Sequence, residues 1–275
     1  NTWTHINPDV YSGAVWALKL TPNGNLLAAT VTGVYVGSNN GASWALSSLQ
    51  YKDTRNLKAD NNGKLFAGTW GFGVYTSTDN GATWSAANSG LGSHLIVTGL
   101  TIAPDNSVYA GTFSGGVFKT VDNGANWTAA SPAYQYIWTM AATTDGKLFA
   151  GTYGDGLYRS NDNGSSWTKT FFPGSFVYEL RIDDGNNIFA TSYSGGVFLS
   201  TNNGDSWTNI GLGGSGLSTL LIVPNGSVAD GNASSMLYTG TTNGAIYMAS
   251  SNVTGVKTES SDVPSEFVLG QNYPN

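Results

Sequence analysis

The chain has 275 residues and a net charge of −6, and this composition excludes several classes of protein. Only 10% of the residues are charged, 12% are aromatic and 37 are glycine. Disordered chains combine high charge with few aromatic residues, so we expect a packed core under an uncharged polar surface. With 11 Lys and Arg residues, the chain lacks the clustered cations that phosphates or an anionic membrane surface attract, and we expect no nucleic-acid partner.

The second of several similar units shows the expected order of strands. Residues Thr54–Ala59 alternate in polarity as a strand does, residues 60–63 form a turn, and residues 64–69 form a second strand. A turn at 71–72 leads to a third strand at 74–77, and an Asp-Asn-Gly hairpin joins it to a fourth strand that begins at Trp84. Val, Tyr, Phe and Thr dominate these segments and no helical period is present, so we predict an all-β chain.

One hairpin motif, Asp/Asn-Asn-Gly-x-x-Trp, repeats five times along the chain. Its Asp or Asn, Gly and Trp residues are Asn39, Gly41 and Trp44; Asp79, Gly81 and Trp84; Asp122, Gly124 and Trp127; Asp162, Gly164 and Trp167; and Asn202, Gly204 and Trp207. The tryptophans are spaced by 40, 43, 40 and 40 residues. Asn-Gly favours a tight hairpin because both central residues of the turn can adopt positive φ. Four strands in each unit of about 40 residues are typical of β-propeller blades.

The number of blades follows from the strands that the units share. The six inner strands are expected to begin at Val15, Thr54, Val97, Ile137, Val177 and Leu217. The sixth unit, residues 217–250, lacks its own Asn-Gly-Trp hairpin, whereas Trp3-Thr4-His5-Ile6 reads as a sixth outer strand that begins with Trp. We therefore predict a six-bladed propeller of four-stranded blades, closed by the N-terminal strand so that no sheet edge is left open. The alternative, a seven-bladed propeller, requires residues that this chain does not have.

The five hairpins resemble the Asp-box, or bacterial neuraminidase repeat, of a propeller family that includes sialidases, xyloglucan-cleaving hydrolases, sortilin-like receptors and photosystem assembly factors. The resemblance implies the fold and leaves the function open, because one fold hosts many functions. We expect the box residues to be scaffold: Asp or Asn binds the amides of its own turn, Gly supplies positive φ, and Trp packs between neighbouring blades. Two boxes carry Asn39 and Asn202 where the family prefers Asp. One carboxylate per box is too few for Ca²⁺, which takes roughly six to eight oxygen ligands.

Residues 263–275 carry a second resemblance. Their Pro-x-x-Phe and Gln-Asn-Tyr-Pro-Asn segments, which begin at Pro264 and Gln271, look like the start of the sorting domain of type IX secretion cargo in Bacteroidetes and related phyla. This resemblance implies a bacterial protein that is exported through the outer membrane and is then secreted or held at the cell surface. We expect a propeller over residues 1–250, a polar linker over 251–262 and a truncated sorting domain over 263–275.

Aromatic residues recur on the face expected to bind ligands, which carries the loops entering the inner strands and the turns between second and third strands. The Asp boxes belong to the opposite face. At the second position of the inner strands and at the second-to-third-strand turns, the candidate ligand-binding residues are Trp16, Arg55, Trp70, Phe113, Trp138, Tyr153, Tyr178 and Tyr193. The loops that enter the inner strands add Tyr51, His94, Tyr134, Tyr136, Phe172 and Phe176. Flat aromatic faces beside polar groups suit sugar rings; the alternative is that these rings pack between blades.

An enzyme would need an acid/base pair on the same face. The candidate catalytic residues are Glu179 and Asp155, as a glycosidase or lyase pair. The alternative for Glu179 is a lone carboxylate paired to Arg55 or Arg181. We do not expect a true sialidase: that activity needs three arginines around the substrate carboxylate, and Arg159, one of only three in the chain, leads into a box hairpin.

Several other classes of site are not expected. No segment approaches the ~18 consecutive apolar residues of a transmembrane helix, so we expect no membrane insertion. The chain has no cysteine and two histidines, which excludes disulfides, thiolate metal sites and a histidine-rich zinc site, and we expect no metal and no cofactor. It begins without an initiator Met or a signal peptide, and we expect a mature or trimmed form.

We interpret the chain as a secreted, monomeric, non-catalytic propeller that recognises glycans or an extracellular protein. The alternative is a carbohydrate-active enzyme, a glycoside hydrolase or polysaccharide lyase of the sialidase-like propeller superfamily. A third class is a structural interaction module.

Overall fold

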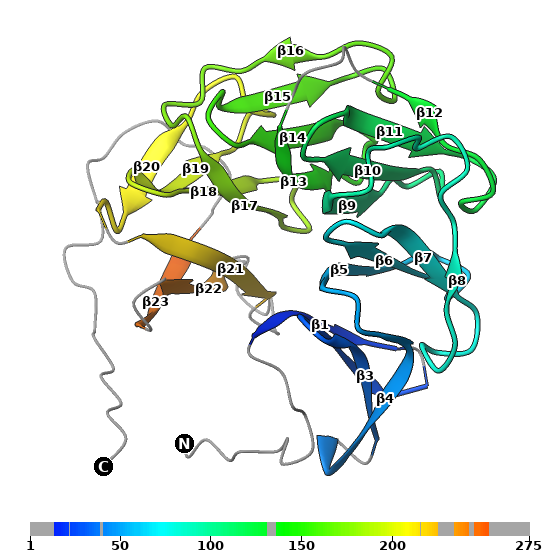
Figure 1. The fold of residues 1–275 in the computed structure, drawn as a ribbon. Helices are drawn as coiled ribbons and strands as arrows, with labels where there is room; N and C mark the ends of the chain where they lie inside the picture. Colours follow the sequence, from blue (N-terminus) through cyan, green and yellow to red (C-terminus); the bar gives the residue numbers. More distant parts are fainter. Residues whose placement is uncertain are drawn as a thin grey trace. The chain divides into compact units, whose positions relative to one another are not determined.

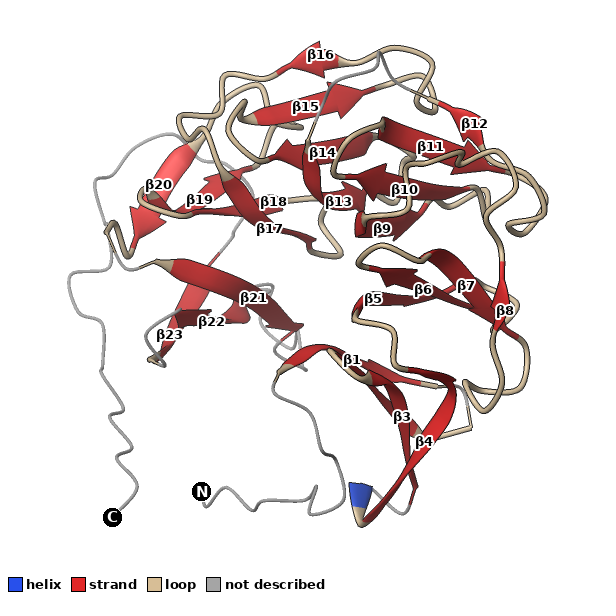
Figure 2. Ribbon diagram, in the orientation of Figure 1, coloured by secondary structure: helices blue, strands red, loops and turns tan. Residues whose placement is uncertain are grey.

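The chain folds entirely into β-sheets over the described residues. The computed structural model describes residues 14–21, 23–38, 41–130, 136–214, 216–224, 234–241 and 245–252. Within these ranges there is no α-helix; a short 3₁₀ segment at Gly41 comes just before β4, and the other connections are turns and loops (Figure 2). The strands form six antiparallel sheets, the blades of a six-bladed β-propeller (Figure 1). The predicted fold is confirmed, in its six-bladed rather than its seven-bladed form.

In each sheet the strands follow one another in chain order. The first sheet contains β1 (Val15–Leu20), β2 (Leu26–Thr30), β3 (Gly33–Ser38) and β4 (Ser43–Gln50); the second contains β5 (Thr54–Ala59), β6 (Leu65–Thr69), β7 (Gly73–Ser77) and β8 (Ser85–Ala86). The third contains β9 (Val97–Ile102), β10 (Val108–Thr112), β11 (Gly116–Thr120) and β12 (Thr128–Ala129); the fourth contains β13 (Ile137–Ala142), β14 (Leu148–Thr152), β15 (Leu157–Ser160) and β16 (Thr168–Lys169). The fifth contains β17 (Val177–Ile182), β18 (Ile188–Ser192), β19 (Gly196–Ser200) and β20 (Thr208–Gly211); the sixth contains β21 (Leu217–Pro224), β22 (Ser234–Thr241) and β23 (Ile246–Asn252).

The first residue of every inner strand agrees with the sequence-based prediction. The sixth sheet has three strands within the described part of the chain, and β23 ends at Asn252. Residues 3–6, which we expect to close the propeller, and the expected sorting segment at 263–275 lie outside the described residues.

Two compact units make up the chain, and each has its own core. One unit comprises Asn1–Ala150 and Arg159–Thr168, and the other comprises Gly151–Tyr158 and Lys169–Asn275. The fourth residue of the inner strand is buried in five blades, as Leu57, Leu100, Met140, Leu180 and Leu220, each at most 6% exposed. Leu18, at the same position of β1, is 62% exposed.

The box hairpins owe their shape to residues in the left-handed region. Asn80 and Gly81 have φ of 57° and 89°, and the same pair of positive values recurs in the next three boxes. The Ser77 hydroxyl donates to Asp79 Oδ1 at 2.7 Å and accepts from Gly81 N–H at 3.0 Å, while Asp79 Oδ1 also accepts from Thr83 N–H at 2.9 Å. The carboxylate therefore accepts the turn's own donors, and the two positive φ values are those of a type I′ turn.

Hydrogen bonds hold the pKa of the box carboxylates below their ordinary value. For Asp122 the bonds from the Asn126 side chain and backbone lower the pKa to about 2, and for Asp162 those from Ser166 lower it to about 2. In the fifth box, Asn202 Oδ1 accepts from Ser206 N–H at 3.0 Å. The amide thus replaces the carboxylate as acceptor without carrying its charge.

Two box tryptophans, Trp127 and Trp167, reach from one blade to the blade before it. Trp127 is 3% exposed, and its Nε1 donates to the backbone oxygen of Ala87 at 2.7 Å. Trp167 Nε1 donates in the same way to Ala130 O at 2.6 Å. Each bond joins positions about 40 residues apart, so the repeat length sets the contact between blades.

Candidate functional site

A buried threonine ends the second strand in three successive blades and fixes the turn that follows. Thr69 donates from Oγ1 to Gly73 O at 2.7 Å and accepts from Phe72 N–H at 3.2 Å. Thr112 and Thr152 donate in the same way to the glycine four residues on. Trp70, Phe113 and Tyr153 come directly after these threonines, so each ring is presented from a rigid turn.

The second residue of several inner strands lies in a β-bulge. In β1 the register moves from Val15 opposite Thr30 to Ala17 opposite Ala29, which leaves Trp16 as the extra residue. Arg55 in β5 and Tyr178 in β17 occupy the same irregularity. Bulges redirect side chains at the rims of sheets, and sequence periodicity gave no sign of these.

Arg55 lies between two tryptophans in the first unit. Its guanidinium carbon is 3.9 Å from the Trp16 ring centroid and 4.8 Å from that of Trp70. The same guanidinium donates to both carboxylate oxygens of Asp53, from Nε at 2.9 Å and from Nη2 at 2.6 Å. Two of its five N–H donors are used in this ion pair. The pair and the two rings hold the guanidinium plane in one orientation.

The aromatic series continues from Trp70 across the next two blades. The Trp70 ring centroid is 5.8 Å from that of Phe113 and 6.4 Å from that of Trp138. The Phe113 ring centroid is 6.4 Å from that of Trp138 and 5.0 Å from that of Tyr136. Trp16 and Tyr136 are 45% and 52% exposed. We call these residues, Trp16, Arg55, Trp70, Phe113, Tyr136 and Trp138, the first aromatic cluster.

The second unit has an aromatic cluster of its own, made of Tyr153, Phe176, Tyr178 and Tyr193. The Phe176 ring is central, with centroids at 4.3 Å from Tyr153, 4.6 Å from Tyr178 and 6.2 Å from Tyr193. Tyr178 and Tyr193 stack at 5.8 Å with planes 24° apart. Burial, and then the neighbouring tyrosines Tyr193 and Tyr153, raise the pKa of Tyr178, so its hydroxyl stays protonated at neutral pH.

Both candidate catalytic carboxylates are held in ion pairs. Glu179 accepts a hydrogen bond from the Arg181 guanidinium. Asp155 accepts from Lys169 Nζ at 2.5 Å and from the Tyr158 hydroxyl at 2.5 Å. The bond from Lys169 comes first among the causes that lower the pKa of Asp155. A general acid requires the opposite shift, toward a raised pKa.

The structure thus separates the sequence-derived candidates into two groups. Trp16, Arg55, Trp70, Phe113 and Trp138 gather in the first unit, and Tyr153, Tyr178 and Tyr193 gather in the second.

Of the loop aromatics, Tyr136 and Phe176 join these clusters. Phe172 is buried, and its ring centroid is 5.1 Å from those of Phe198 and Trp207. The ring centroid of His94 is 5.6 Å from that of Phe118. Tyr51 is 79% exposed. Tyr134 lies outside the described residues.

Sequence reasoning did not assign Asp53 as the partner of Arg55. The signal available was their spacing of two residues, which places both side chains on the same side of an extended segment.

Searches for other sites gave two results. Across the residues that the structure describes, no three His, Asp or Glu side chains gather in a way that would hold a metal ion. The same part of the chain contains no helix with the length and apolarity needed to cross a membrane.

Comparison with known proteins supports the fold. The family model of the BNR/Asp-box repeat matches residues 75–86, which span the second box. No curated protein matches the chain. Solved propeller structures do match. The extracellular domain of BT3049 from B. thetaiotaomicron matches with a TM-score of 0.72 and 16% identity, over 100% of this chain and 37% of that one. An ancestral GH74 enzyme matches with a TM-score of 0.70 and 17% identity, over 93% of this chain and 38% of that one. A structure of YCF48 bound to D1 peptide matches with a TM-score of 0.58 and 15% identity over 82% of this chain and 74% of that one.

The level of similarity limits what these structures imply. At these identities the likeness concerns the fold alone. The chain spans little more than a third of the length of BT3049 and of the GH74 enzyme.

Proposed function

We propose that the chain is an exported, monomeric binding propeller that recognises glycans through the first aromatic cluster. The observation that carries this proposal is the arrangement around Arg55: two tryptophans flank a guanidinium that Asp53 holds in place. The site is rigid before any ligand binds, so binding loses little side-chain entropy.

The chemistry of this cluster fits a sugar. The half-exposed rings of Trp16 and Tyr136 offer flat surfaces to the C–H face of a pyranose. The N–H donors of Arg55 that do not serve Asp53, and the Asp53 oxygens, offer hydrogen bonds to hydroxyl groups. A flat apolar surface with a few fixed polar groups is typical of small-ligand sites.

An enzymatic function has less support from the geometry. Glu179 and Asp155 each have a cationic partner, and the pKa of Asp155 is lowered. The lowered pKa of Asp155 works against the protonated carboxyl group that a glycosidase needs as its acid. The likeness to a GH74 enzyme is a likeness of fold and does not change this.

Export is part of the proposal. Two of the similar structures are extracellular domains, and the C-terminal segment resembles a type IX sorting domain. We expect to detect the protein in the outer-membrane or culture-medium fraction of its source. Deletion of residues 263–275 and whatever follows them should abolish this localisation. Retention inside the cell in both cases would contradict export.

The binding test uses the purified chain on a panel of immobilised glycans, with products assayed in parallel. Trp16→Ala and Tyr136→Ala are expected to weaken binding to any positive glycan by about tenfold each, which is about 1.4 kcal/mol. Phe171→Ala is the matched control, because Phe171 is 89% exposed and belongs to neither cluster. Equal binding by all four proteins would refute the assignment of the site, turnover of a glycan would favour the enzymatic alternative, and silence on the panel would favour a protein ligand.

A further inference from the structure

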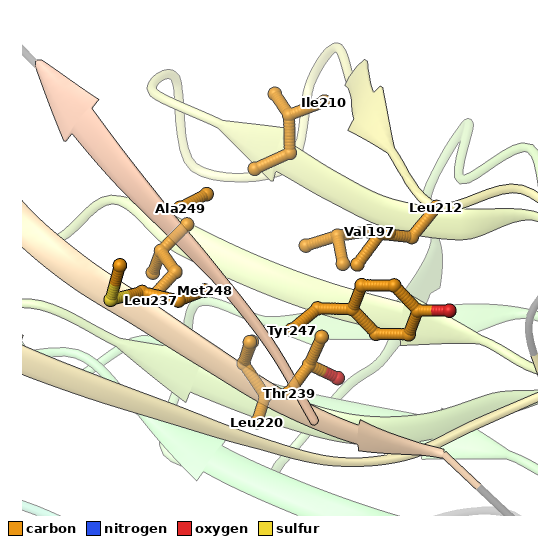
Figure 3. A pocket seen from close by; sticks show the side chains of 9 residues that line it. All are labelled: Val197, Ile210, Leu212, Leu220, Leu237, Thr239, Tyr247, Met248 and Ala249. Atoms are coloured by element: carbon orange, nitrogen blue, oxygen red, sulfur yellow. The ribbon is translucent and has the colours of Figure 1, made fainter. Parts of the chain in front are cut away.

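The apolar pocket of the second unit is poorly suited to a polar ligand. Its lining is mostly apolar, and Figure 3 shows side chains that converge on it from Val197, Leu220 and Met248. One of its few polar groups, the Thr239 hydroxyl, already donates to a backbone oxygen at 2.6 Å. A sugar would find few hydrogen-bonding partners in this pocket, whereas Arg55 in the first unit has donors to offer.

The Arg55 guanidinium is bounded on both faces and along one edge. The rings of Trp16 and Trp70 flank it, with centroids 3.9 and 4.8 Å from its central carbon. Asp53 occupies the edge formed by Nε and Nη2 and accepts one hydrogen bond from each nitrogen, at 2.9 and 2.6 Å. The Arg55 side chain is nevertheless 23% exposed. The outer edge, formed by Nη1 and Nη2, is therefore the part of the guanidinium that a ligand can reach.

This outer edge keeps most of the hydrogen-bond donors of Arg55. Of the five N–H groups of a guanidinium, two serve Asp53, and within the described part of the chain Arg55 has no other hydrogen bond or ion pair. The remaining N–H groups are on Nη1 and Nη2, and two of them point outward in parallel. Such a fork matches the two oxygens of a carboxylate, and bonds to an ionised acceptor are about twice as strong as bonds to a neutral one.

Positive charge exceeds negative charge at this end of the first unit. Its described charged residues are those in the loops that enter the inner strands, in the turns between second and third strands and at the first three positions of the inner strands: Lys52, Asp53 and Arg55. Lys52 Nζ lies 4.8 Å from the Phe72 ring centroid, in the turn that follows Trp70. Two cations against one carboxylate favour an anionic ligand here, although the whole chain carries a charge of −6.

Other carboxylates of the first unit lie at the far ends of its inner strands. Asp60, Asp105 and Asp145 are in the turns that follow β5, β9 and β13. Asp60 comes after Arg55 by roughly 16 Å, along a strand that rises about 3.3 Å per residue. This separation is about twice the Debye length of ~8 Å at physiological salt, so these carboxylates oppose an anion at the outer edge only weakly.

Building on the proposed function, we infer that the glycan recognised by the first aromatic cluster contains a uronic acid, whose carboxylate binds the outer edge of Arg55. The pyranose ring of the uronate packs on the half-exposed ring of Trp16. Asp53 holds the opposite edge of the guanidinium and so fixes the direction of the fork.

The test compares uronate oligosaccharides with the same oligosaccharides after reduction of their carboxyl groups. Reduction replaces each carboxylate by a neutral CH2OH group and leaves the sugar ring intact. The probes are oligogalacturonate, oligomannuronate and glucuronate-containing oligosaccharides, and calorimetry of the purified full chain measures their affinities. We expect at least one acidic oligosaccharide to bind about tenfold more tightly than its reduced form, because a charge-assisted pair of hydrogen bonds replaces neutral ones.

Two substitutions of Arg55 separate the fork from simple charge attraction. Arg55→Lys keeps the positive charge without the planar pair of donors, and Arg55→Gln removes the charge. In both variants we expect the preference for the acidic form to fall below about twofold. Lys64→Gln is the matched control, because it removes one cation from the opposite end of the same blade, where Lys64 donates to Asn123 O at 2.7 Å; its preference should equal that of the wild type. Circular dichroism shows whether each variant is folded, and the comparison on the wild-type chain remains decisive if an Arg55 variant is not.

Several results would overturn the uronate assignment. Equal affinity of the wild type for acidic and reduced forms would do so, and glycan binding at the cluster would still stand if Trp16→Ala weakened both. An undiminished preference in Arg55→Lys would show that charge alone suffices. Binding of sulfated oligosaccharides but of no uronate, tested as a third arm, would assign the fork to sulfate instead. No binding of any uronate would also overturn the assignment, whereas the proposed function fails only if no glycan on the full panel binds.

Discussion

The packing of Trp127 makes a quantitative prediction about how the blades are held together. The indole is 3% exposed, lies in a cluster with Val74, Leu100 and Phe118, and donates from Nε1 to Ala87 O at 2.7 Å. Replacement of a buried tryptophan by alanine costs about 3–5 kcal/mol, because transfer free energy is lost and a cavity remains. The carbonyl of Ala87 also loses its partner, at a cost of about 1 kcal/mol.

Trp84 provides the comparison within the same unit. Its ring is only partly buried, and its Nε1 donates to Gly81 O inside its own hairpin, at 2.8 Å. Trp84→Ala therefore removes less packing between blades, and we expect a cost of about 1–2 kcal/mol. Urea titration and calorimetry of the two variants measure this difference.

For a unit of this size, 1 kcal/mol shifts the melting temperature by about 2–4 °C. We expect Trp127→Ala to lower the melting temperature of the transition that involves the first unit by about 10 °C, and Trp84→Ala by less than half as much. Equal shifts, or a shift below about 2 °C for Trp127→Ala, would refute the view that the box tryptophan joins neighbouring blades.

Two further predictions concern the box carboxylates and a glycine. The pKa values of Asp122 and Asp162 are lowered from 3.8 to about 2 in the folded chain, so their stabilising contribution is complete above the unfolded pKa and is lost as the pH falls from 3.8 toward 2. A chain with Asp122→Asn and Asp162→Asn should lose less melting temperature than the wild type between pH 5 and 2 in a series of thermal scans, and an identical loss in both proteins would contradict this. Gly90 and Gly92 both have positive φ, but a Cβ on Gly90 would lie 2.0 Å from Trp127 O, whereas a Cβ on Gly92 would meet nothing within 4 Å. Gly90→Ala should therefore destabilise the chain by several kcal/mol and Gly92→Ala by only about 1 kcal/mol; equal destabilisation in urea titrations would show that φ strain alone matters.

Local chemistry allowed most of the fold to be predicted from the sequence. Polarity alternates along the strands, and Asn-Gly turns adopt positive φ wherever they occur, so the first residues of all six inner strands and the hairpins between them follow from short segments. The repeat of about 40 residues multiplied this signal. The aromatic candidates were likewise visible as columns of equivalent positions, but their division between the first and second clusters was not.

Other features of the site depend on contacts that no short segment contains. Trp16 and Arg55, in the first aromatic cluster, and Tyr178, in the second, lie where bulges interrupt the pairing of their strands. The sequence left the partner of Glu179 open between Arg55 and Arg181, and the structure pairs it with Arg181. Arg55 is instead bound by Asp53.

The sequence by itself determined the strands, the turns and the number of blades, because alternation and turn chemistry act over a few residues. Only the tertiary structure decided which rings touch and which charges pair. Those outcomes depend on strand register and on packing between residues about 40 positions apart, where the free energy of burial, rather than local propensity, selects the partner.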